Sequence, residues 1–167
     1  FVIGNNQHFG IEGDSKDFIK TAIIKGDDDN RLFFENMRFN IEHGKEAEPF
    51  TAIIKDSTLS DDQKKSARES YATITAKVVA YQNELIEKNP KTLTARLIKS
   101  TQSIEAPMPP KKADGSYDST FQLRYYREHF FYNFDLADDA KLRLPRPVYQ
   151  AKIKEYQNKL YVSVPDT

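Results

Sequence analysis

SDDQKKSARESYATITAKVVAYQNEL, residues Ser60 to Leu85, contains the clearest structural pattern in the chain. Its first four residues match a capping box, in which the Ser60 hydroxyl accepts the backbone N–H of Gln63 and the Gln63 side chain reaches back. Apolar and aromatic residues then recur at alternating intervals of four and three positions: Ala67, Tyr71, Ile74, Val78, Tyr81 and Leu85. This spacing predicts a long helix with one apolar seam, which we expect to pack against other helices in a bundle.

Two neighbouring stretches predict further helices. One begins near Asp27, where any of the residues 27–29 can cap a helix start, and its apolar face carries Leu32, Phe33, Met37 and Ile41. We expect residues 44–56 to be irregular and to lead into the helix that starts at Ser60. The other helix follows that long one, with Asn89 as its cap and Pro90 in its first turn, where a missing N–H costs nothing.

The second half of the chain predicts two more helices. Residues 102–116 contain three prolines and a glycine, a composition typical of an exposed linker. A helix is predicted over about 118–132, an irregular stretch over 133–146, and a last helix from Pro147. The apolar face of that last helix consists of Tyr149, Ile153, Tyr156 and Leu160.

The first 25 residues predict short strands rather than helices. Val2-Ile3, residues 8–11 and residues 18–24 are β-branched or aromatic runs separated by turn residues. An isolated hairpin is marginal in water, so these strands must pack on the helices or complete a larger sheet. The expected fold class is therefore mainly α, a helical bundle of about five helices with a short N-terminal β hairpin or strand set.

Composition excludes several kinds of chemistry. The 167 residues include 25 basic and 25 acidic side chains, so the formal net charge is zero. Nucleic-acid binding usually requires an excess of basic residues. Because this chain has no such excess, we expect it not to bind nucleic acid. The chain has no cysteine, which removes thiolate nucleophiles, disulfides, redox pairs and thiolate metal sites. Its three histidines leave little for a histidine metal centre, and we expect no cofactor.

Acidic runs offer two weak candidates for a cation site. Asp27, Asp28 and Asp29 lie together, but the alternating ligands, glycine and glutamate of a calcium loop are missing from that stretch. We therefore favour helix capping for this run. For Asp135, Asp138 and Asp139 we favour turn formation.

Catalytic motifs are absent from the sequence. It contains no glycine-rich phosphate loop, no nucleophile elbow and no His-x-x-x-His pair. A convergent carboxylate pair remains an alternative, because spatial neighbours are invisible in one sequence. The basic residues of 141–159, which outnumber the acidic ones six to one, are interpreted as the solvated face of the last helix rather than a nucleic-acid site.

The densest chemical feature is the aromatic run of residues 121–134, FQLRYYREHFFYNF. On a helical wheel its rings surround almost the whole helix, which is typical of a central helix or an interface. We favour packing for this run. The alternative is an aromatic groove for a peptide or a sugar, with Tyr125, His129 and Tyr132 at its rim.

Several packing motifs resemble a known family. They are HFFYNFDL (129–136), DAKLRLP (139–145), the spacing of Lys152, Ile153, Tyr156 and Leu160, and the closing Pro165-Asp166. These residues resemble a helical domain of unknown function that precedes the thioredoxin domain in Bacteroidetes TlpA-like thiol-disulfide oxidoreductases. IKGDDDNRLFF (24–34) is similar to the end of the preceding β domain running into the first helix. The chain departs from the family pattern at Lys141 and Leu144.

This resemblance implies two domains and a partner. Residues 1–26 would be the tail of an N-terminal β domain and residues 27–167 the helical domain, both within a longer protein. The function it implies is a non-catalytic accessory module that positions, dimerises or selects substrates for a C-terminal thioredoxin-like domain. The implied location is the periplasm or the cell envelope, with a lipid anchor outside these residues as the only membrane attachment. The family assigns no catalytic residues to this domain, so we expect no enzyme in this part of the protein.

A homodimer is a further expectation on the same grounds. The second functional hypothesis is a stand-alone envelope module that binds a peptide or a glycan through the aromatic groove.

Overall fold

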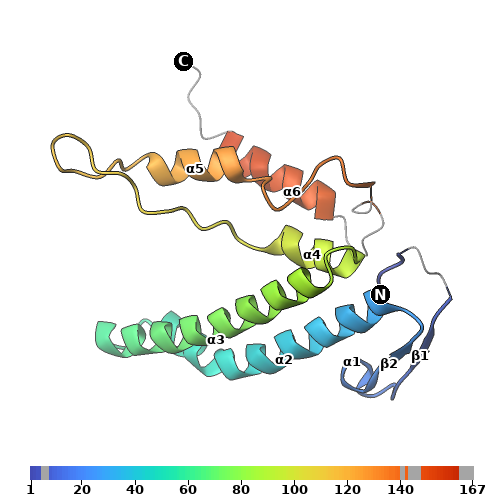
Figure 1. Cartoon of the computed structure of the whole chain (residues 1–167). Helices are drawn as coiled ribbons and strands as arrows, with labels where there is room; N and C mark the ends of the chain where they lie inside the picture. Colours follow the sequence, from blue (N-terminus) through green and yellow to red (C-terminus); the bar gives the residue numbers. More distant parts are fainter. Residues whose placement is uncertain (5–7, 140–141, 143–147, 162–167) are drawn as a thin grey trace. The chain divides into compact units, whose positions relative to one another are not determined.

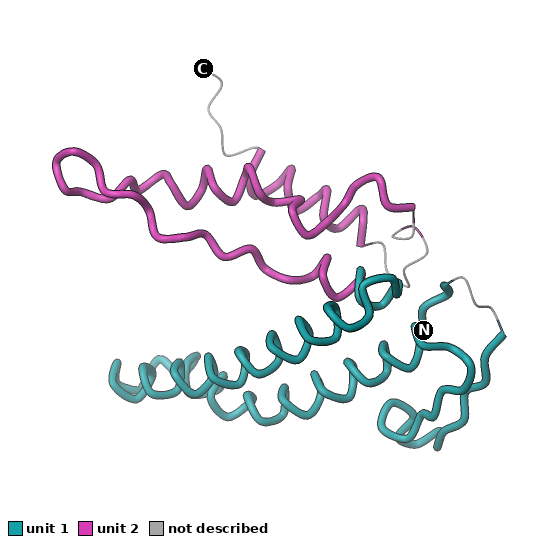
Figure 2. The backbone as a smooth tube through the Cα atoms, in the orientation of Figure 1, with its two compact units in different colours: residues 1–96 teal, residues 97–167 magenta. Residues whose placement is uncertain are grey.

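The chain is mainly α, as predicted, with a small antiparallel sheet near its N-terminus (Figure 1). The computed structural model describes residues 1–4, 8–139, 142 and 148–161. Contacts between Cα atoms divide the chain into two compact units, Phe1–Arg96 and Leu97–Thr167 (Figure 2).

Two long helices dominate the first unit. α2 (Asp28–Lys55) and α3 (Asp61–Lys88) lie side by side as a helical hairpin (Figure 1). Ala67, Ile74 and Leu85 of the predicted seam are buried in this unit. Tyr81 stacks on Phe39 of α2 with 4.0 Å between the ring centroids. Tyr71 is the exception in the seam, because its side chain is 42% exposed.

Both long helices start at the caps that the sequence predicts. The Asp27 side chain accepts the Asn30 N–H at the start of α2. The capping box of α3 is complete, because Ser60 Oγ accepts the Gln63 N–H and Gln63 Oε1 accepts the Ser60 N–H. These short-range hydrogen bonds depend only on residues three positions apart, which is why the sequence predicts them correctly.

The prediction of an irregular stretch at 44–56 is wrong, because α2 continues without a break to Lys55. Gly44 and Pro49 both weaken a helix on their own, and Pro49 removes the N–H that the Lys45 carbonyl would accept. The helix persists because α3 packs along it. Phe39 stacks on Tyr81 of α3 at 4.0 Å, and Lys77 of α3 pairs with Glu46 of α2 at 3.6 Å.

The N-terminal strand prediction is right in part. β1 (Gly10–Glu12) pairs antiparallel with β2 (Ile23–Lys25), with Ile11 opposite Ile24. Residues 18–21, predicted as strand, form the short helix α1 (Phe18–Thr21) instead. The helical turn places the Phe18 ring against Phe34 of α2 at 5.8 Å, a tertiary contact that the local pattern does not contain. The predicted strand at Val2-Ile3 is also wrong, because Val2 is held by the buried side chain of Asn30.

α4 (Leu93–Thr101) starts later than predicted. Asn89 caps the C-terminus of α3 rather than the start of α4, and its Nδ2 donates to the Leu85 carbonyl. The cap of α4 is Thr92, whose Oγ1 accepts the Ala95 N–H. Because asparagine suits either end of a helix, residue type alone does not assign Asn89 to one of them.

The second unit contains α5 (Phe121–His129), α6 (Val148–Tyr156) and a single π-helical turn, η2 (Gln157–Tyr161). α5 is shorter than the predicted helix over 118–132, since turns begin at Phe130. Pro147, the predicted start of the last helix, lies outside the described residues. Residues 102–110 carry no regular secondary structure, in agreement with the predicted linker, and a turn closed by a Lys111–Tyr117 bridge follows.

Candidate functional site

Three of the aromatic side chains on α5 form a column along one face of the helix. Phe121, Tyr125 and His129 are spaced four residues apart, so they lie above one another. The rings of Phe121 and Tyr125 are 6.0 Å apart and tilted, whereas Tyr125 and His129 stack at 3.9 Å with an interplanar angle of 12°. Tyr132 follows one turn later and is 76% exposed. We use the name aromatic column for Tyr125 and His129 of this face together with the exposed Tyr132, which lies in the turn after α5.

The stacking determines which parts of these rings a ligand can reach. Tyr125 and His129 each use one ring face on the other, so the surface left to a ligand includes their polar edges. His129 Nδ1 lies 2.9 Å from the Tyr125 carbonyl oxygen. Since a carbonyl can only accept, Nδ1 is the donor there, and Nε2 is the acceptor in the neutral ring. The column therefore offers hydrogen-bonding edges and the exposed ring of Tyr132.

Three other rings of the aromatic run pack inside the second unit, whereas Tyr126 is 40% exposed. Phe130 and Phe131 contact Tyr156 of α6, with ring centroids 5.4 Å and 5.1 Å apart. Phe134 is buried and lies 5.8 Å from Tyr149. The run therefore has two parts, one packed on α6 and one on the surface. The sequence could not separate them because its rings cover nearly every side of the predicted helix.

A small polar cluster orients the start of α5. Asp118 accepts hydrogen bonds from the backbone N–H and the hydroxyl of Thr120, and from Arg124 at 2.7 Å. These bonds, first of all those from Thr120, hold the pKa of the Asp118 carboxyl below its ordinary value. The cluster connects the exposed turn before α5 to the helix that carries the aromatic column.

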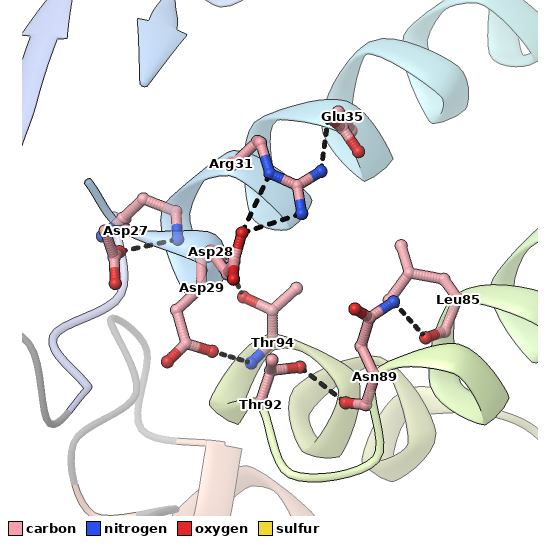
Figure 3. Close-up of polar contacts among 10 residues, drawn as sticks. Asp27, Asp28, Asp29, Arg31, Glu35, Leu85, Asn89, Thr92 and Thr94 are labelled. Carbon is pink, nitrogen blue, oxygen red and sulfur yellow. Dashed lines mark hydrogen bonds and ion pairs between the residues drawn. The ribbon is translucent and has the colours of Figure 1, made fainter. Parts of the chain in front are cut away.

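The acidic run at residues 27–29 has structural partners on all three side chains (Figure 3). Asp27 caps α2. Asp28 pairs with Arg31 at 2.9 Å, and Arg31 also pairs with Glu35 at 3.0 Å. Arg31 has a raised pKa, chiefly because of its hydrogen bond to Asp28. The interpretation of Asp27 as a helix cap is confirmed.

Asp29 connects α2 to the start of α4 (Figure 3). Its Oδ1 accepts the Thr94 N–H at 3.1 Å, and its backbone carbonyl accepts the Thr94 hydroxyl at 2.7 Å. A carboxylate at the first turn of a helix satisfies free N–H groups and opposes the positive end of the helix dipole. Within the described ranges, no three His, Cys, Asp or Glu side chains gather as a metal site requires.

Lys152, Lys159 and Asp135, which belong to the charged stretches noted in the sequence, also make contacts within the protein. Lys152 lies over the Phe130 ring at 4.2 Å, and Lys159 pairs with Glu155 at 3.1 Å. Lys141, Arg143 and Arg146 lie outside the described residues. Asp135 accepts the Ala137 N–H at 2.9 Å, which is the local bond of the predicted turn.

The sequence pattern did not predict a groove that runs along α2. One hollow of about 540 Å³ is lined by Lys20, Arg38, Ile41, Glu42 and Lys45. A second, of about 620 Å³, is lined by Ile41, Gly44, Lys45, Glu48, Thr51, Ala52 and Lys55. Apart from Lys20 of α1, the lining residues recur at helical spacing along α2. This spacing forms a stripe on one face only when residues 44–56 are assigned to a helix.

Comparisons with protein-family models, curated proteins and solved structures gave no match. In the part of the chain that the structure describes, none of the helices combines the length and the apolar character needed to cross a membrane.

Proposed function

We propose that this chain is a non-catalytic accessory module of a cell-envelope thiol-disulfide oxidoreductase, and that the aromatic column contacts a thioredoxin-like domain. The observation that carries the proposal is the division of the aromatic run into a packed part and a surface part. Phe130, Phe131 and Phe134 pack against tyrosine rings of α6, whereas Tyr132 is exposed. The sequence resemblance supplies the identity of the partner.

The chemistry of the column suits a protein surface. Tyrosine combines a large apolar ring with a hydroxyl and few rotatable bonds, so it binds at a low entropic cost. The outward edges of Tyr125 and His129 can exchange hydrogen bonds with a partner backbone. In this proposal the protein lies in the periplasm or at the cell envelope, and a lipid anchor outside these residues is its only membrane attachment.

The first test is the complete coding sequence. We expect a Cys-x-x-Cys motif in a thioredoxin-like domain downstream of Thr167. We also expect this chain alone to show no disulfide reductase activity, because it has no cysteine. A coding sequence that ends at Thr167 would contradict the proposal.

The second test is a titration of this chain with a TlpA-like thioredoxin domain from the same genome, followed by aromatic NMR shifts. We expect the signals of Tyr125, His129 and Tyr132 to move. Tyr132→Ala should weaken binding by about tenfold, as expected for an exposed interface aromatic. The matched control is Tyr161→Ala, which removes another exposed tyrosine of the second unit and should leave binding unchanged.

A peptide- or glycan-binding module is the competing outcome of the same experiment. Sugars bind on open ring faces, and here one face of Tyr125 and one face of His129 are already occupied by their mutual stacking. Shifts with oligosaccharides or peptides, and none with the thioredoxin-like domain, would overturn the proposed partner.

A further inference from the structure

The segment between α4 and the exposed turn is rich in proline. Three prolines lie in the run APMPPKK, residues 106–112, which we call the proline segment. A proline ring fixes φ close to the value of a polyproline II helix, and a residue that precedes proline is confined to extended or polyproline II conformations. Each of the residues 106–110 is either a proline or precedes one. The proline segment is therefore pre-organised as a short polyproline II helix.

The structure agrees with this conformation. Residues 103–110 run as an extended trace between α4 and the turn, without helix or strand (Figure 1). Their peptide bonds are trans, and no backbone hydrogen bond among the described residues involves them. A polyproline II helix has three residues per turn and no internal hydrogen bonds. The segment thus has the open backbone that this helix leaves to solvent or to a partner.

Exposure along the proline segment follows a period of three. Pro107 and Pro110 are both exposed and lie on one edge of such a helix. Ala106 and Pro109 are half-buried and lie on a second edge. Met108, on the third edge, is 80% exposed. The edge formed by Pro107 and Pro110 is therefore accessible to a partner.

Charge gives the proline segment a direction. A polyproline II helix presents similar proline rings when it is read from either end, so a charge at one end decides which way it binds. Glu105 precedes the segment, and Lys111 and Lys112 close it. Neither Glu105 nor Lys112 has an ion-pair partner among the described residues, and both are exposed. Lys112 stands two positions after Pro110, which completes the pattern P-x-x-P-x-K.

The turn after α4 holds the lysine end of the proline segment in place. Lys111 forms a bridge with Tyr117, and the Lys112 N–H donates to the Ser116 carbonyl at 2.8 Å. Lys111 Nζ also lies 5.8 Å from the centre of the Tyr117 ring. A segment held in this way loses less conformational freedom on binding than a free tail. Because Lys111 is directed to a ring of its own chain, Lys112 is the lysine left for a partner.

We propose that the proline segment is a docking site for a domain of the SH3 type, whose groove is lined by aromatic rings and carries a carboxylate at one end. Pro107 and Pro110 pack between the aromatic rings, and Lys112 pairs with the carboxylate. From Pro107 to Lys112 the segment is about 16 Å long, at 3.1 Å per residue. An interface of this length is small, so we expect a dissociation constant of roughly 10–200 μM.

A titration of the complete chain with an isolated SH3 domain that prefers P-x-x-P-x-K/R ligands tests the proposal. We expect the amide NMR signals of Met108, Lys111 and Lys112 to shift. Pro107→Ala and Pro110→Ala should each weaken binding by about tenfold, because each removes a ring from the contact edge. Neither variant should change the thermal midpoint, since the segment contains no helix or strand.

Met108→Ala is the matched control for the two proline variants. It removes a larger and more exposed apolar side chain, but from a different edge of the helix. Binding should therefore stay within about twofold of wild type.

Two lysine variants test the register of binding. Lys112→Gln should weaken binding by about tenfold, because it removes the cation that faces the carboxylate. Lys111→Gln, one position earlier, should change binding by less than about threefold. Equal losses in the two variants would indicate general charge attraction and would contradict the proposed register.

Two further results would overturn the inference. One is an absence of amide shifts in the proline segment at about 500 μM SH3 domain. The other is a loss of binding in Met108→Ala as large as in Pro107→Ala, since that contact would be a non-specific apolar one. The titration with the thioredoxin-like domain follows the aromatic column instead, so failure of this docking site and failure of the proposed function are distinguishable.

Discussion

Asn30 shows how one polar side chain fixes the N-terminal segment to the first unit. Its Oδ1 accepts the Val2 N–H at 2.8 Å, and its Nδ2 donates to the Val2 carbonyl at 2.8 Å. Both residues are completely buried. A side-chain amide can satisfy an N–H and a carbonyl at once, so it replaces the partner strand that Val2 lacks.

Asn30→Ala should destabilise the first unit by about 2–4 kcal/mol, because two buried backbone groups of Val2 lose their partners. Urea denaturation followed by far-UV circular dichroism measures the change. Asn158→Ala, which alters an exposed asparagine in η2, should stay within about 0.5 kcal/mol of wild type. Equal stability of the two variants would contradict this role of Asn30.

Asp118 should make the start of α5 sensitive to acid. Its pKa is lowered by hydrogen bonds from Thr120 and then Arg124, so the folded state favours the charged form. The stabilisation is therefore present above the ordinary aspartate pKa and is lost as the pH falls through the lower folded value. Below about pH 4 we expect faster amide exchange at Thr120 and Arg124. In Asp118→Asn, exchange at these residues should lose that acid-dependent step.

Among the elements, α2 differs most from its sequence prediction. Gly44 and Pro49 favour a break in a helix, so a prediction from neighbouring residues ends the helix before them. The observed helix spans both, because Phe39 stacks on Tyr81 of α3 and the hairpin with α3 holds the segment helical. Packing energy from a distant segment thus outweighs helix propensity.

Pro49→Ala should stabilise the first unit by about 1–3 kcal/mol, because alanine restores the hydrogen bond to the Lys45 carbonyl and removes the ring clash. Urea midpoints at low protein concentration measure the effect without association. Pro109→Ala, in the segment without regular structure, should give no gain. A loss of stability in Pro49→Ala would contradict the view that packing on α3 holds α2 helical in spite of the proline.

For the whole molecule, the division at Arg96 places the longest stretch without a helix or strand among residues 8–139 inside the second unit. Residues 102–110 contain no helix or strand, and the turn that follows is exposed. Gly115 in this turn has a φ of 81°, a value that glycine adopts without strain.

Trypsin should therefore cut first at Lys111 or Lys112 among residues 1–139, since exposed turns are the preferred sites of proteolysis. Mass spectrometry of short digests identifies the cut. The double variant Lys111→Gln, Lys112→Gln should slow this cleavage by about tenfold. Earliest cuts at Lys64 or Lys65, inside α3, would contradict the expected order of stability.

Features that depend on neighbouring residues can be predicted from the sequence. The capping box at Ser60, the cap at Asp27, most of the α3 seam and the mainly α class follow from hydrogen bonds and spacings within a few turns. The length of α2, the helical conformation of Phe18–Thr21, the position of Asn89 at the end of α3 and the division of the aromatic run depend on contacts between distant segments. The physical reason is that burial against a distant segment contributes more free energy than local propensity, and one sequence does not record which segments meet.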